Sequence, residues 1–153
     1  MSQLDATIMV VALASTWAMA GVIWVIQLVH YPIFDAIERG ENDEAWRRFG
    51  DRHRTSISFV VGPFMAAEGA TGIWIVLDPP GDASVALPLV AGALMAVAYG
   101  VTAFVSVPLH ERLTPAYDAQ ALAKLVSTNW WRTFAWTARG VVLAVLAVSV
   151  FTS

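Results

Sequence analysis

Three histidines, His30, His53 and His110, are the side chains of this sequence best suited to metal chemistry. A neutral imidazole nitrogen ligates metal ions, and three such ligands with an open position support oxygen or water chemistry. We therefore predict a metal site, with Fe, Cu and Zn left open, and Asp51 and Glu111 as acceptors for the ring N–H groups. Haem held by His30 and His110 is the alternative cofactor. The simpler alternative is that each ring hydrogen-bonds a backbone carbonyl or a lipid phosphate.

The densest polar and aromatic stretch runs from Asn129 to Arg139. Its arginine Arg132 suits an anionic group, because a guanidinium binds carboxylates and phosphates through two parallel hydrogen bonds. We predict Arg132 as a catalytic residue, with Asn129, Trp130 and Trp136 in contact with a substrate. The alternative is an arginine that reaches the lipid headgroups between tryptophan anchors.

Polar residues also recur at helical spacing inside the apolar runs. Tyr99, Thr102, Ser106 and His110 follow steps of 3, 4 and 4 residues, which places them on one helical face. Such groups normally face the interior of a bundle or a cavity. The first run carries Gln27 and Tyr31 near its end, and the fourth run carries Arg139. We predict that these three side chains and Tyr99 contact the substrate. Hydrogen bonding between helices is the competing explanation.

Glu68 is the carboxylate that lies in the middle of an apolar run. An ionisable group at that depth is a functional candidate by default, so Glu68 is predicted as catalytic or protonatable. The alternative is a structural ion pair with Arg139, whose long guanidinium side chain reaches deep into the bundle.

These residues need long apolar helices to position them. The 153 residues are 58% hydrophobic and 14% charged, and the mean hydropathy of +0.62 is typical of an integral membrane protein. Four runs, at about 8–31, 56–77, 85–108 and 132–151, suit helices that cross roughly 30 Å of hydrocarbon. The sequence therefore predicts an all-α, four-helix membrane bundle that forms a single domain. The absence of cysteine excludes disulfides and thiolate ligands.

Charge predicts the orientation. All nine basic residues lie at or just inside one side of the four runs: Arg39, Arg47, Arg48, Arg52, Arg54, Arg112, Lys124, Arg132 and Arg139. Since basic residues near span ends stay in the cytoplasm, the connections 35–55 and 109–131 are predicted to be cytoplasmic, and both termini non-cytoplasmic. A bacterial inner membrane is the expected location.

Two short helices are expected within those connections. Trp46, Phe49 and His53 share one face of a segment that we predict to lie along the membrane interface. Thr114 followed by Pro115 predicts the start of a second short helix, with Thr114 as its N-cap.

The layout resembles that of the small four-helix membrane proteins of the anthrone-oxygenase-like group. The resemblance rests on the four spans, on Pro32 directly after His30-Tyr31, and on the Trp-x-Arg-Thr element made by Trp130, Arg132 and Thr133. It implies oxygenase-type chemistry on an aromatic or lipophilic substrate.

The leading hypothesis is a membrane-embedded redox enzyme with a histidine-lined metal site at the cytoplasmic helix ends, acting on a lipophilic molecule from the bilayer. A second is a non-enzymatic bundle that binds lipid, quinone or haem, or serves as an accessory subunit. A third is a small proton-coupled transporter that uses Glu68. Self-association or a larger membrane complex is expected in each case, and nucleic acid is not an expected partner.

Overall fold

The computed structural model describes residues 2–33, 43–81 and 84–152, so Arg39 and the loop around it lie outside the described residues. The chain forms α1 (Gln3–Val25) with the π-helical segment η1 (Ile26–His30), α3 (Asp43–Leu77), α4 (Ala86–Val101) with the π-helical segment η2 (Thr102–Ser106), α5 (Val107–Leu113) and α6 (Ala119–Phe151). The described residues contain helices and no strand, which confirms the predicted all-α class.

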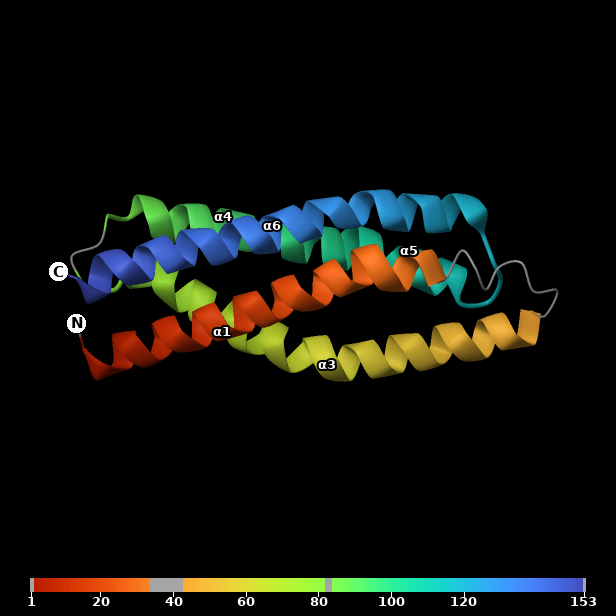
Figure 1. Cartoon of the computed structure of the whole chain (residues 1–153), viewed down its shortest axis with the longest axis horizontal. Coiled ribbons are helices and arrows are strands. Elements are labelled where there is room, and N and C mark those ends of the chain that lie inside the picture. The colour runs from red at the N-terminus through yellow and green to blue at the C-terminus, as the bar shows by residue number, and fades with distance from the viewer. Residues whose placement is uncertain (1, 34–42, 82–83, 153) are drawn as a thin grey trace.

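The helices run side by side as an elongated four-helix bundle (Figure 1). Within the described residues, four helices are long and apolar enough to cross a membrane: Gln3–Ile33, Glu44–Leu77, Ala86–Leu113 and Ala119–Phe151. The two termini lie at one end of the bundle (Figure 1). The start of α3, the end of α5 and the start of α6 meet at the other end, which we call the basic end after Arg47, Arg48, Arg52, Arg54 and Arg112.

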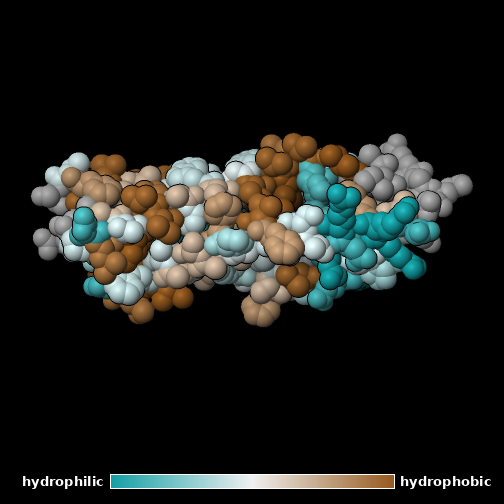
Figure 2. Space-filling model, turned by 90° about the horizontal axis from the view of Figure 1, so that it is seen from below, coloured by the Kyte–Doolittle hydropathy of each residue, from teal (hydrophilic) through white to brown (hydrophobic). Residues whose placement is uncertain are grey.

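The surface of the bundle is apolar where lipid would cover it. Large hydrophobic side chains stand outward, with Phe104 83% exposed and Phe59 and Leu77 each 78% exposed. Hydrophilic side chains gather over the start of α3 (Figure 2). An apolar exterior around buried polar groups such as Glu68 and Arg139 is the reverse of a water-soluble bundle and fits a chain that lies in hydrocarbon.

The predicted interfacial helix around Trp46 is not a separate element. It is the first part of α3, whose 35 residues would extend about 50 Å, far more than the hydrocarbon core requires. Trp46 is buried, and its indole N–H donates to the carbonyl of Leu113 at 2.7 Å. This contact packs the start of α3 against the end of α5, so the aromatic face predicted to lie against lipid or bundle lies against the bundle at Trp46.

The predicted N-cap at Thr114 is wrong. Thr114 lies at the C-terminal end of α5, and its hydroxyl donates back to the carbonyl of His110 at 2.8 Å. The N-cap of α6 is Asp118, which has extended backbone and accepts a hydrogen bond from the N–H of Ala121. That bond, followed by the neighbouring Arg112, lowers the pKa of Asp118 below its usual value. A carboxylate at the first turn also suits the helix dipole.

Candidate functional site

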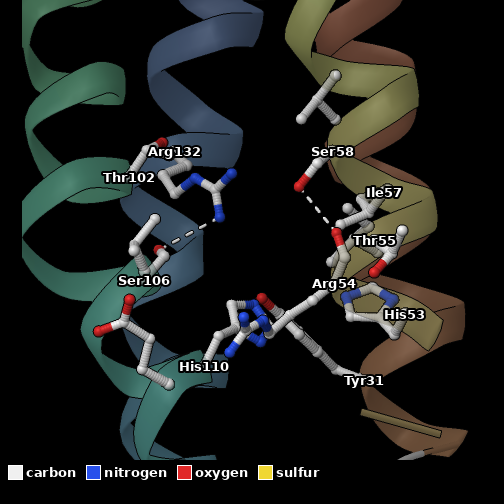
Figure 3. Close-up of a pocket in the computed structure, with 14 residues that line it drawn as sticks. Tyr31, His53, Arg54, Thr55, Ile57, Ser58, Thr102, Ser106, His110 and Arg132 are labelled. Carbon is white, nitrogen blue, oxygen red and sulfur yellow. Dashed lines mark hydrogen bonds between the residues drawn. The ribbon is translucent and has the colours of Figure 1, made fainter. Parts of the chain in front are cut away.

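A cavity of about 400 Å³ lies at the basic end, between α3 and the η2–α5 segment. Its polar lining includes Tyr31, His53, Ser58, Ser106, His110 and Arg132, and Figure 3 shows these side chains around the space between the helices. The volume falls within the range of small-molecule sites. Polar groups from several helices thus surround one space.

The two π-helical segments both reach this cavity. η1 contributes Ile26, and η2 contributes Thr102 and Ser106. Each segment ends two residues before a proline, Pro32 or Pro108, and the one residue between them, Tyr31 or Val107, donates its N–H to the carbonyl five positions back. A proline has no N–H and its ring crowds the carbonyl four residues earlier, so the preceding turn widens by one residue. π-helical turns are frequent at functional sites.

The predicted meeting of the three histidines is confirmed. The ring centroids of His30 and His53 are 4.3 Å apart with their planes 25° apart, and those of His53 and His110 are 5.5 Å apart. His30 and His53 are therefore stacked, whereas ligands of one metal point their nitrogens at a common centre. Among the described residues, no group of three or more histidine or carboxylate side chains is arranged to hold a metal ion. The metal and haem sites stay predictions.

Arg132 enters the cavity from α6 and is only 7% exposed. Its Nη1 donates to Ser106 Oγ at 3.2 Å and to Asn129 Oδ1 at 3.1 Å. The Asn129 amide in turn donates to Gln27 Oε1 at 2.7 Å. Gln27 and Asn129, predicted as substrate contacts, lie behind Arg132 outside the cavity lining, so they orient the guanidinium from the rear.

A second polar cluster lies deeper in the bundle around Glu68, which is fully buried. The predicted pair with Arg139 is confirmed, with Nε of Arg139 2.9 Å from the carboxylate. The same carboxylate accepts hydrogen bonds from Thr16 and Trp136, each at 2.8 Å. The hydroxyl of Tyr99 donates its one proton to the carbonyl of Met65 at 2.5 Å and lies 3.4 Å from the carboxylate. Three donors thus hold Glu68, and it does not line the cavity.

Tyr99, Trp136 and Arg139 therefore belong to the Glu68 cluster and not to the cavity where we predicted substrate contacts. The two sites are nevertheless adjacent. The guanidinium of Arg132 lies over the ring of Trp136, 5.3 Å from the centroid, while the indole N–H of that ring faces Glu68. Trp136 thus lies between the guanidinium of Arg132 and the Glu68–Arg139 ion pair.

Trp130 lies away from both sites. Its ring meets Trp24 edge-on at 5.7 Å and stacks on Phe134 at 5.3 Å. Phe134 is 57% exposed on the outside of the bundle, so Trp130 belongs to an aromatic group beside the bilayer, and it is not in the cavity lining.

Sequence reasoning missed the contribution of α3 beyond His53. Ile57 and Val61 follow His53 at four-residue steps, and Ser58 follows Arg54 in the same way, so one side of α3 forms a cavity wall. That four-residue spacing is visible in the sequence and could have indicated this wall. The prolines after η1 and η2 were the second signal, because each marks a helix that opens at the level of the histidines.

An apolar groove of about 470 Å³ lies between α1 and α3. It shares Ile26, His53 and Ile57 with the cavity, and its outer part is formed by side chains such as Val25 and Val60. These two valines are 59% and 45% exposed, on the apolar outer surface of the bundle. The polar cavity and the outer apolar surface are thus separated by one layer of side chains.

Comparison of the chain with protein-family models, with curated protein sequences and with solved structures gives no match. The resemblance to the anthrone-oxygenase-like group stays a prediction.

Proposed function

We propose that this chain is an integral membrane protein that binds a lipid-soluble small molecule in the cavity at its basic end. The observation that carries the proposal is the shared wall of His53, Ile26 and Ile57 between the polar cavity and the apolar groove. A molecule with a polar head and an apolar tail fits both compartments.

The route of access follows from the exposure of the groove. Its outer residues face hydrocarbon, so a molecule dissolved in the bilayer reaches it without crossing water. Ile57 is half-buried on α3 at the boundary between groove and cavity. A rotamer change at such a residue takes nanoseconds or less, whereas separating two packed helices is far slower.

Native mass spectrometry of the protein released from mild detergent tests this function. The parent should carry a bound small molecule, and Ser58→Trp, which fills the cavity from α3, should lose it. Ala66→Trp is the matched control, because Ala66 is an exposed residue of the same helix outside the cavity lining. Equal occupancy in the parent and in Ser58→Trp would overturn the proposal.

We also propose that the basic end faces the cytoplasm, because its arginines are the kind retained on that side. The chain has no cysteine, so single cysteines report orientation without background. Cysteine at Arg52 should be shielded from an impermeant thiol reagent in intact cells, and cysteine at Ser84 should react. The opposite labelling pattern would reverse the orientation.

A second candidate is the predicted redox enzyme, in which His30, His53 and His110 hold an oxygen-activating metal ion beside the substrate. The observation that favours it is the adjacency of three imidazoles, of which His53 and His110 line the cavity and His30 lines the groove beside it. Side-chain rotation would have to break the stack of His30 on His53. Elemental analysis and an absorption spectrum separate metal, haem and neither. Metal that is absent from the parent, or is retained in both His30→Ala and His110→Ala, contradicts this candidate.

A further inference from the structure

We infer that the cavity selects a lipid-soluble molecule with a carboxylate head, and that Arg132 binds this head. The inference rests on the proposed function and adds the chemical class of the ligand. Arg132 is only 7% exposed and lines the cavity, yet it makes no ion pair with any described residue. A buried charge without a counter-charge is strongly unfavourable, so a ligand anion is the missing partner.

The charge balance of the interior supports a ligand that carries a single negative charge. The buried charged side chains among the described residues are Glu68, Arg139 and Arg132. Glu68 already pairs with Arg139, which leaves one positive charge on Arg132. Two exposed groups of opposite charge, Glu111 and Arg54, also line the cavity, and neither forms an ion pair with Arg132. Their formal charges cancel, so one carboxylate neutralises the remaining charge on Arg132.

The hydrogen bonds of Arg132 leave one edge of the guanidinium for the ligand. Nη1 is occupied by Ser106 and Asn129. Nε is buried without a partner, and Nη2 makes no hydrogen bond to any described residue. Nε–H and one Nη2–H point in the same direction, and together they form the fork that a carboxylate accepts side-on.

The position of this fork is fixed from behind. Gln27 and Asn129 hold Nη1 in place, and the ring of Trp136 lies under the guanidinium at 5.3 Å. Preorganised donors lose little conformational entropy when a ligand binds. The apolar groove that shares its wall with the cavity then accepts the tail.

Two photoreactive probes with the same diazirine-bearing chain test the inference, one ending in a carboxylic acid and the other in an alcohol. Both are added to membranes containing the full-length protein, and labelled peptides are mapped by mass spectrometry. The acid should label the cavity segments of α3 and η2–α5 at least about tenfold more strongly than the alcohol, in line with the loss of a charge-assisted hydrogen bond. Arg132→Gln should remove this preference and leave the weaker alcohol labelling in place. Arg132→Lys should keep part of it.

The matched control is Arg52→Gln, because Arg52 is an exposed arginine of α3 outside the cavity lining and should leave the acid preference unchanged. If the alcohol probe labels Arg132→Gln as strongly as it labels the parent, this variant is folded. Equal labelling by acid and alcohol in the parent, or an acid preference that survives in Arg132→Gln, would overturn the carboxylate inference. Absence of cavity labelling by both probes would instead contradict the proposed function.

Discussion

Neutralising Glu68 should destabilise the bundle strongly. Its carboxylate is fully buried and accepts hydrogen bonds from Thr16, Trp136 and Arg139. Hydrogen bonds between helices in membranes contribute about 0.6–1.7 kcal/mol each, and Glu68→Gln keeps one acceptor oxygen, so about half of the set is lost. Removing one partner of a buried ion pair costs about 3–5 kcal/mol. We expect Glu68→Gln to lower the free energy of unfolding by about 3 kcal/mol.

Arg139→Gln should lower the free energy of unfolding by a similar amount, because it leaves the Glu68 carboxylate without its charged partner. The double variant, Glu68→Gln with Arg139→Gln, should be little less stable than either single variant, because the second change removes a charge that has already lost its partner. Unfolding can be followed by tryptophan fluorescence as sodium dodecyl sulfate is added to dodecylmaltoside micelles. Arg112→Gln, at an exposed ion pair with Asp118, is the control and should change stability little. A Glu68→Gln protein as stable as the parent, or additive losses in the double variant, would refute this reasoning.

Two further substitutions test the packing of the bundle and its pH dependence. Gly72→Ala should destabilise the protein by about 1–3 kcal/mol in the same unfolding assay, because a Cβ there would lie 2.6 Å from Met95 Sδ and 2.7 Å from Arg139 Nη2. Gly100→Ala meets nothing within 4 Å and should be neutral or stabilising, so equal losses at the two glycines would contradict the packing described. The lowered pKa of Asp118 means that its charged form stabilises α6 above its usual pKa of about 4, and this stability is lost as the pH falls through the lower folded value. Asp118→Asn, which still caps the helix, should therefore have a lower melting temperature than the parent at pH 7, and this difference should be smaller at pH 3. An equal difference at both pH values would contradict the role of the charge.

The sequence predicted the parts of the fold that hydropathy determines. The four apolar helices and the Glu68–Arg139 pair followed from the cost of unpaired polar groups in hydrocarbon. The adjacency of His53 and His110 followed from the ends of the helices that carry them. These predictions needed only composition and helical spacing.

Tertiary contacts decided the rest. Trp46 reaches the carbonyl of Leu113, which makes the start of α3 part of the bundle, and no local pattern encodes that distance. Thr102, Ser106 and His110 all line the cavity, as their spacing predicted. Tyr99 precedes Thr102 and lies deeper in the bundle, about 16 Å from His110 along the helix, where it contacts Glu68 instead of the cavity. Sequence alone also could not show that, of the two buried arginines, Arg139 pairs with a carboxylate and Arg132 does not.

An experimental structure of the protein in a lipid bilayer tests the central claim most directly. We predict elongated density that begins beside the Nε and Nη2 atoms of Arg132, passes His53 and Ile57, and ends in the groove between α1 and α3. A cavity closed by packing of α3 against α5, or one filled only by ordered water while the groove is empty, would contradict the claim.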